Sequence, residues 1–208
     1  MSNLQTMKAD LRNPNKVYNR LKYLFDTATP EQVEAGSIWY DEAREYATGL
    51  AIKHGYTVST VCAVLSALSP AVSWNVNKRD AHTLLGLAAV GETEPDNIPA
   101  STYGPQVEKA LRIAWTGNPD LIGNGLKTVS FYLNMVGIQD GSVCTIDRHI
   151  LGAATGSRDA THKDISVTSK RYFDVSAQIK RLARNRNLQP KQVQAVIWLT
   201  YRERIGLN

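Results

Sequence analysis

Two residues twenty positions apart, Lys127 and Asp147, have the types and surroundings that covalent chemistry needs. Lys127 follows two glycines in "GNGLK" and falls in the first turn of a helix expected over 125–136. The positive end of a helix disfavours an ammonium group and favours a free amine, so this lysine is a candidate nucleophile. The alternative interpretation is a surface lysine that reaches solvent or a phosphate group.

Asp147 stands at the inner end of an apolar segment in "SVCTIDRHI". The run 142–146 predicts a short strand-like segment that enters a core, where an unpaired carboxylate is costly to desolvate. One explanation is a helix cap, because aspartate is a good N-cap for a helix that begins at Arg148, worth about 1 kcal/mol. The other explanation is an active-site carboxylate, and the two roles are compatible.

The elements that must position these residues are predicted to be helical almost throughout. Thr29 is the expected N-cap of a helix, with Pro30 in its first position and Gln32 closing a capping box. This helix is expected to bend or break near Gly36-Ser37 and to end at Gly55. The apolar segment 58–68, capped by Thr57 and ended by Pro70, is expected to be central, and 91–102 is the best candidate loop. Further helices are expected near 75–90, 105–116, 125–136, 148–154, 168–186 and 190–205, giving an all-α domain of nine or ten helices.

Composition limits the classes of protein. Apolar residues make up 43% of the 208, which is enough for a substantial core. No stretch approaches the roughly 20 apolar residues of a membrane span, and the first residues lack the apolar core of a signal peptide, so we expect a cytoplasmic protein. Cys62 and Cys144 lie in apolar runs and are expected to be buried, reduced thiols. Two cysteines exclude a four-cysteine zinc or iron–sulfur site within one chain.

The charge is concentrated at one end of the chain. Residues 158–208 carry eleven Lys and Arg against four Asp and Glu, a net charge of +7, whereas the whole chain carries +5. Such a basic segment fits a polyanion partner such as DNA. The alternative is a set of solvated helix faces, and we expect 180–186 and 201–204 to face either solvent or phosphates.

These motifs together resemble a known family. "GNGLK" followed by "TIDRHI" resembles the G-x-G-x-K … V-D-x-H signature of the helix-hairpin-helix (HhH-GPD) DNA glycosylases, the superfamily that includes endonuclease III. "VCAVLSALSPAVSWNVNKRDAHTLL" and "YGPQVEKALRIA" resemble helices that precede this signature. The resemblance implies a single two-lobed helical domain, with a motif-bearing core at 57–155. Residues 1–56 and 156–208 would pack together as the second lobe.

The resemblance also implies an activity, that of a bifunctional DNA glycosylase with AP-lyase activity. A modified or damaged base is flipped out of the duplex, and Lys127 attacks the sugar to form a Schiff base. Asp147 is the catalytic carboxylate that stabilises the positive charge on the sugar. Implied DNA contacts are Gly123, Asn124, Gly125, Thr128 and Lys78, and the implied base pocket is Ser69, Trp74, Asn75, Asn77 and His149.

Four aromatic residues and one histidine have a second interpretation. Trp74 could be a core anchor instead of a surface on which a base stacks. We expect Trp39-Tyr40 and Trp198 to be core residues, because they stand at helical spacing within apolar patterns. A structural hydrogen bond is the favoured role of His149, which matches the histidine of the family motif.

The chain departs from the family pattern in several places. Asn124 stands where the family has an apolar residue, the segment before the hairpin leaves little room for its first helix, and no cluster-binding cysteines are present. We therefore expect no iron–sulfur cluster and no catalytic metal, and only a monovalent cation at the hairpin would fit the family. "LSPAVSWN" resembles bacteriophage-encoded relatives, some of which act in thymine hypermodification. A base-modifying enzyme and a catalytically silent DNA-binding module are the alternatives, in each case as a monomer.

Overall fold

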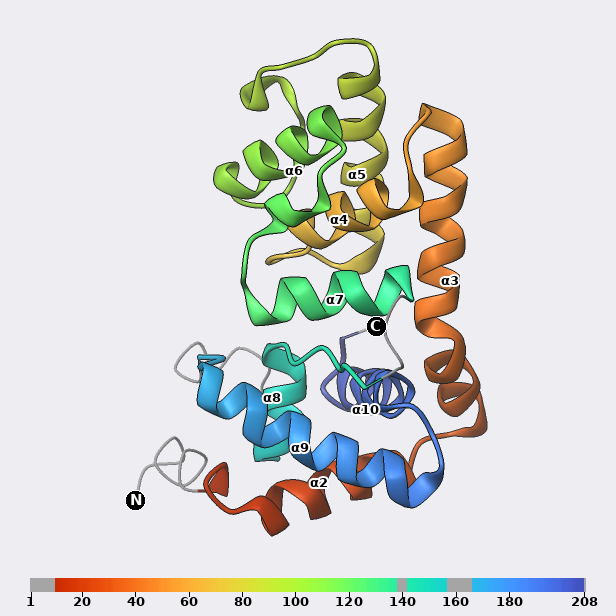
Figure 1. The fold of residues 1–208 in the computed structure, drawn as a ribbon. Coiled ribbons are helices and arrows are strands. Elements are labelled where there is room, and N and C mark those ends of the chain that lie inside the picture. The colour runs from red at the N-terminus through yellow and green to blue at the C-terminus, as the bar shows by residue number, and fades with distance from the viewer. Residues whose placement is uncertain (1–9, 138–141, 157–165, 208) are drawn as a thin grey trace. The chain divides into compact units, whose positions relative to one another are not determined.

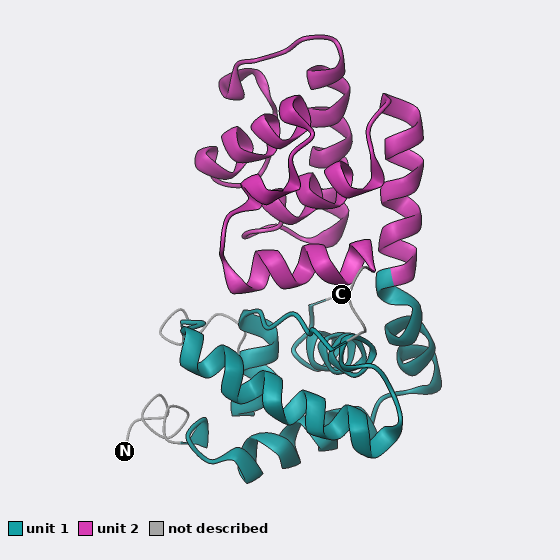
Figure 2. Ribbon diagram, in the orientation of Figure 1, with its two compact units in different colours: residues 1–40, 139–208 teal, residues 41–138 magenta. Residues whose placement is uncertain are grey.

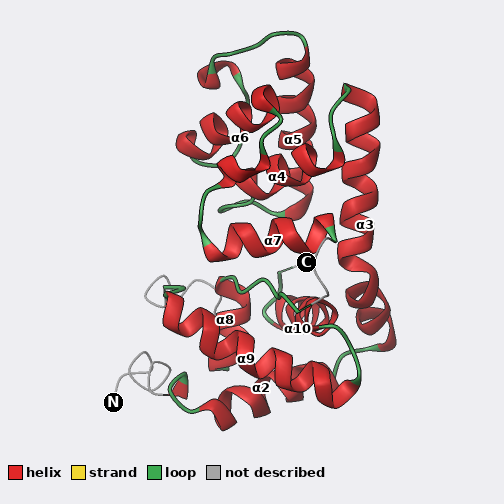
Figure 3. Ribbon diagram, in the orientation of Figure 1, coloured by secondary structure: helices red, strands yellow, loops and turns green. Residues whose placement is uncertain are grey.

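The computed structural model describes residues 10–137, 142–156 and 166–207, and all regular structure within these ranges is helical (Figures 1 and 3). The prediction of an all-α protein is therefore confirmed. The run 142–146 has no regular secondary structure and pairs with no strand in the described part of the chain, so the expected strand-like segment is irregular. No described helix is both long and apolar enough to span a bilayer.

The chain divides into two compact units (Figure 2). Unit 1 comprises residues 1–40 and 139–208, and unit 2 comprises residues 41–138. Unit 1 contains α2 (Pro14–Asp26), the start of α3 (Pro30–His54), α8 (Arg148–Thr155), α9 (Ser169–Arg186) and α10 (Pro190–Arg204). Unit 2 contains the rest of α3, α4 (Val58–Leu68), α5 (Trp74–Ala89), η1 (Pro95–Asn97), α6 (Gly104–Thr116), η2 (Pro119–Ile122) and α7 (Leu126–Val136).

These boundaries differ from the expected core at 57–155. The first boundary lies inside α3, because this helix continues from unit 1 into unit 2. The second lies before α8, because α8 packs against α2 and α10. Lys127 and Asp147, which the expected division placed in one core, therefore belong to different units.

The expected break of α3 near Gly36-Ser37 is wrong, since the helix is continuous from Pro30 to His54. Gly36 is buried, and a Cβ atom built on it would lie 2.5 Å from Cγ2 and 2.6 Å from the backbone nitrogen of Val196 on α10. This glycine therefore permits two helices to cross closely. The capping box before it is confirmed, because the Thr29 and Gln32 backbone N–H groups each donate to the other's side chain.

Unit 2 is built around α4, as its apolar sequence predicted. Every residue from Thr60 to Leu68 is buried, and α4 packs against α5, α6, α7 and η2. The Thr57 hydroxyl accepts the Thr60 N–H at 3.1 Å and fixes the start of the helix. Its end at Ser69 is where the candidate site begins.

The irregular segment 142–147 runs into the core of unit 1. Cys144, Thr145 and Ile146 are buried. The Tyr172 hydroxyl donates to the Cys144 carbonyl at 2.9 Å, and the Tyr40 hydroxyl lies 3.0 Å from the Thr145 hydroxyl. These contacts hold the segment in a fixed path, which determines where Asp147 emerges. The two cysteines are free and buried, and burial raises the pKa of Cys62 to about 12 and that of Cys144 to about 11.

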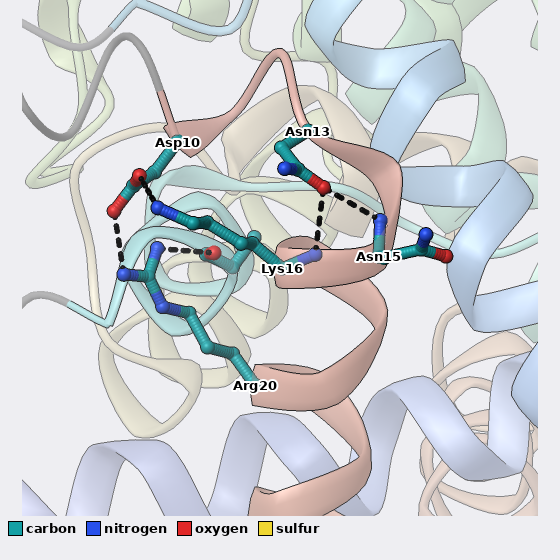
Figure 4. A network of polar contacts seen from close by, with 6 residues as sticks. Asp10, Asn13, Asn15, Lys16 and Arg20 are labelled. Atoms are coloured by element: carbon teal, nitrogen blue, oxygen red, sulfur yellow. Dashed lines mark hydrogen bonds and ion pairs between the residues drawn. The ribbon is translucent and has the colours of Figure 1, made fainter.

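A polar network joins the N-terminal part of unit 1 to α8 (Figure 4). Asp10 accepts hydrogen bonds from Lys16 at 2.9 Å and from Arg20 at 2.6 Å. Arg20 also reaches the Ala154 carbonyl near the end of α8, at 3.5 Å. Hydrogen bonds from Lys16 and Arg20 lower the pKa of the Asp10 carboxyl.

Candidate functional site

The hairpin that precedes Lys127 is short and rich in glycine. Gly123 ends η2 with a φ of +80°, a backbone region that favours glycine, and Gly125 is the N-cap of α7. No side chain caps α7, and no acidic residue stands in its first turn. The backbone N–H groups at this helix start are therefore suited to an anion such as a phosphate.

The amine of Lys127 contacts the end of another helix. Its Nζ donates to the Ser69 hydroxyl at 2.5 Å and lies 3.5 Å from the Ser69 carbonyl oxygen. Ser69 is the C-cap of α4, and the negative end of that helix favours an ammonium. Two helix ends therefore act on Lys127 in opposite directions, whereas the sequence indicated only one. The contact joins the predicted nucleophile to a residue predicted for the base pocket.

Aromatic rings lie beside this lysine. The Lys127 amine is 5.5 Å from the centroid of Phe131, one turn further along α7, and the Phe131 ring meets the Trp74 ring edge-on at 6.2 Å. Trp74 also meets Tyr46 edge-on at 6.2 Å, and the amine of Lys78 lies 5.7 Å from the Trp74 centroid. Trp74 is half-buried, so its role is intermediate between core anchor and open surface. We call Ser69, Lys127, Phe131, Trp74, Tyr46 and Lys78 the lysine cluster.

Two members of the lysine cluster were not predicted from the sequence. Phe131 stands four residues after Lys127, the spacing at which helical side chains meet, and this signal could have identified it. Tyr46 comes from α3, and nothing in the sequence pattern relates it to Trp74. Its hydroxyl donates to the Lys78 carbonyl at 2.9 Å, which anchors the start of α5.

Two predicted base-pocket residues of α5 have different positions. Asn75 is exposed in the first turn of the helix, beside Trp74. Asn77 is only 2% exposed, and its amide donates to the Leu65 carbonyl at 3.0 Å. Asn77 thus ties α5 to the central helix α4, and we leave it out of the candidate site.

The hairpin has a basic neighbour that sequence reasoning missed. Lys109 of α6 donates to the Ile122 carbonyl at 3.3 Å, at the turn where Gly123 begins the hairpin. Asn124 is exposed, and the Thr128 hydroxyl lies beside Gly125. A shallow cavity of about 210 Å³ adjoins Lys109 and is lined by Pro105, Glu108, Lys109, Arg112 and Leu121.

The carboxylate of Asp147, in unit 1, accepts hydrogen bonds on both oxygens. Oδ1 accepts the Ile150 backbone N–H at 2.8 Å, so the predicted cap of α8 is confirmed. Oδ2 accepts the indole N–H of Trp198 at 3.0 Å and lies 3.2 Å from Nδ1 of His149. The structural hydrogen bond expected of His149 is thus present, and Trp198, predicted as a core residue, is a partner of the candidate carboxylate.

Charge and aromatic rings surround this carboxylate. The Arg202 guanidinium stacks over the Trp198 ring at 4.3 Å, and Trp39 and His149 both meet that ring edge-on. Burial lowers the pKa of Arg202, an effect that the nearby Asp147 charge opposes. Arginine remains charged at neutral pH in such surroundings, so Arg202 supplies a permanent positive charge near Asp147.

No group of three or more His, Cys, Asp or Glu side chains in the described residues is arranged to hold a metal ion. The described residues provide amines and a carboxylate, groups that can act by nucleophilic and electrostatic catalysis. The molecule is thus an all-helical protein of two units. One unit carries a lysine at a glycine hairpin, and the other carries an aspartate held by a helix start and an indole.

The chain belongs to a family of unknown function, DUF7178, whose family model matches residues 3–205. No curated protein and no solved structure is significantly similar to the chain. The family description carries no activity, so a function must be argued from the two groups of residues just described.

Proposed function

We propose that this protein is a DNA glycosylase with associated AP-lyase activity. The observation that carries the proposal is the position of Lys127. Its amine is fixed by the Ser69 hydroxyl and by the Phe131 ring, directly after a glycine hairpin whose N–H groups are suited to a phosphate. A nucleophile next to a phosphate site is what attack on a nucleotide sugar requires.

Lys127 performs the covalent step. Its deprotonated amine forms a bond to the anomeric carbon while the glycosidic bond breaks. The departing base takes the bonding electron pair and the proton that the attacking nitrogen loses. The adduct opens to a Schiff base between Nζ and the sugar, and elimination of the 3′ phosphate nicks the strand. The Ser69 hydroxyl orients the amine, because Lys127 Nζ lies 2.5 Å from it before the reaction begins.

Asp147 performs the electrostatic step. Departure of the base develops positive charge on the sugar, and the Asp147 anion stabilises this charge. The N–H groups of Ile150 and Trp198 hydrogen-bond to the anion and hold it in one orientation. An oriented anion needs little reorganisation during the reaction, which is the source of the rate enhancement.

The remaining residues of unit 2 bind the substrate. Trp74 and the exposed Asn75 supply a ring edge and an amide to a flipped base, and Lys78 supplies a cation to the adjacent phosphate. Gly123, Gly125 and Thr128 contact the backbone at the hairpin. We propose that the protein acts as a monomer in the cytoplasm of a bacterium or of a phage-infected cell, where its DNA substrate lies.

Borohydride trapping tests the proposal directly. The protein is mixed with end-labelled DNA that contains one abasic site, and borohydride reduces any Schiff base to a stable covalent adduct. We expect an adduct with the wild-type chain and none with Lys127→Ala. Lys109→Ala is the matched control, because it removes a neighbouring lysine from the hairpin and should still trap.

The outcomes separate this function from its alternatives. Trapping by Lys127→Ala at the wild-type level would show that Lys127 is not the nucleophile. A wild-type chain that binds abasic DNA without trapping is not a lyase. Mass spectrometry of treated phage DNA would then separate a base-modifying enzyme from a silent DNA-binding module.

A further inference from the structure

In unit 1, arginine side chains of α9 and α10 lie over aromatic rings on both flanks of α2. The arginines come from the last two turns of α9 and from the end of α10, and both helices pack against α2. We call these six residues the arginine–aromatic face. Its pairs are Arg181 on Tyr18 at 4.2 Å, Arg204 on Tyr23 at 4.9 Å and Arg186 on Phe25 at 5.8 Å from guanidinium carbon to ring centroid.

Positive charge is in excess on and around this face. Asp26 pairs with both Lys22 and Arg186, so one carboxylate is shared by two cations. Asp10 is shared by two cations in the same way. Arg181 and Arg204 bond only to neutral oxygens among the described residues, those of Asn15 and Thr27. These contacts therefore involve two carboxylates and six cations, which are Lys16, Arg20, Lys22, Arg181, Arg186 and Arg204.

Stacking prepares these arginines for an anionic partner. A ring under the guanidinium plane fixes the orientation of the side chain and reduces the entropy that binding must remove. A guanidinium stacked in this way keeps the N–H groups at the edge of its plane in a fork that matches phosphate oxygens. The face thus presents oriented guanidinium groups, of which Arg181 and Arg204 make no ion pair among the described residues.

We propose that the arginine–aromatic face binds the phosphodiester backbone of nucleic acid without reading its sequence. The proposal adds a second DNA contact surface to the proposed function, and it does not depend on the chemistry of Lys127. Phosphate contacts of this kind position a protein on DNA and supply affinity that falls as salt rises.

An anionic membrane surface fits this face less well. Interfacial binding requires apolar side chains that enter the lipid, together with positive charge. A guanidinium group lies over each of the three rings, and only Tyr23 among them is largely exposed, at 61%. A structural explanation also exists for two of the arginines, since Arg186 and Arg204 stand in last helical turns, where cations complement the helix dipole. It does not apply to Arg181, which lies more than a turn from the end of α9.

The test uses the full chain and an undamaged duplex of about 30 base pairs, with binding measured by fluorescence anisotropy over a range of salt concentrations. The variant is Arg181→Gln/Arg186→Gln/Arg204→Gln. We expect the plot of log K against log salt to become less steep by about three, one for each lost phosphate contact. The affinity at low salt should fall about tenfold or more. Circular dichroism and thermal melting report whether the variant is folded.

A control variant removes the same charge elsewhere. Lys53→Gln/Lys170→Gln/Arg171→Gln changes three cations outside the face and should retain most of the slope. Equal losses in the two variants would overturn the proposal in favour of a general effect of net charge. Unchanged duplex binding by the first variant, with lost binding to vesicles that contain phosphatidylserine, would overturn it in favour of a membrane.

Two further measurements keep the test decisive. If the triple variant does not fold, Arg181→Gln alone serves, because Arg181 makes no ion pair among the described residues, and its slope should fall by about one. The same titration with Lys127→Ala separates this proposal from the proposed function. That variant should bind undamaged duplex through the arginine–aromatic face whether or not the wild-type chain traps abasic DNA.

Discussion

The indole N–H of Trp198 donates a hydrogen bond to Oδ2 of Asp147, at 3.0 Å, while the other oxygen of that carboxylate caps α8. The two interactions use different oxygens. Asp147 is therefore both a cap and an oriented anion at the same time, and substitutions can separate the two roles.

Trp198→Phe should weaken the reaction while α8 keeps its cap. A hydrogen bond to a charged group contributes about 1.5–3 kcal/mol, so we expect at least about a tenfold fall in the single-turnover rate and a moderate fall in melting temperature. Trp39→Phe is the control, because it keeps an aromatic ring beside Trp198 and leaves the indole N–H of Trp198 in place. Equal rates for the two variants would show that the indole N–H does not position Asp147.

Asp147→Asn should abolish most of the chemistry and also cost some stability. Asparagine is a good N-cap, but an NH2 group takes the place of one carboxylate oxygen, so either the Ile150 or the Trp198 N–H loses its acceptor. We expect about 1–2 kcal/mol of destabilisation and a rate that is lower by about 100-fold or more. Stability is measured by urea unfolding and rate by single-turnover assay.

The double variant Asp147→Asn/Trp198→Phe tests this account of the stability loss. Once the indole donor is absent, Asp147→Asn should cost little further stability, because no donor is left without an acceptor. Activity should remain as low as in Asp147→Asn alone. Additive stability losses would show that the two side chains do not interact as described.

Gly36→Ala should destabilise the protein, although alanine is normally the better helix former. The new Cβ atom would meet Val196 at 2.5 Å, so α3 and α10 must separate, at a cost of about 1–3 kcal/mol. Gly49→Ala in the same helix is the matched control, because nothing lies within 4 Å of its Cβ position. The control should be stabilised by about 0.5–1 kcal/mol. If the melting temperatures of both variants changed in the same direction, the prediction would be contradicted.

Asp10 should stabilise the fold at neutral pH, and this contribution should be lost in acid. Its folded pKa is lowered by Lys16 and Arg20, so its contribution is present above the unfolded value, near 3.8, and is lost as pH falls through the folded value. We expect Asp10→Asn to cost on the order of 1 kcal/mol at pH 7, since Lys16 is largely exposed, and much less at the acid end. Urea unfolding at several pH values checks this, and a constant loss at every pH would contradict it.

The sequence by itself determined the features that depend on neighbours along the chain. Thr29 with Gln32, Thr57 and Asp147 cap the helices that their positions predicted, because a cap requires only a side chain and backbone groups two or three residues away. The apolar segments 58–68 and 142–146 predicted burial for the same local reason. The all-helical class followed from the spacing of apolar residues throughout the chain.

Only the tertiary structure decided the relationships between distant segments. The Ser69 hydroxyl reaches Lys127, and the Trp198 indole reaches Asp147, across 58 and 51 residues of sequence. Gly36 was expected to bend or break α3, yet the helix continues through it, and the close approach of α10 makes it a crossing point. Pattern analysis records the type of each residue and its spacing along the chain. It cannot specify which helix packs against which, because that choice depends on the fit of whole side-chain surfaces, and long-range partners are fixed only when those surfaces meet.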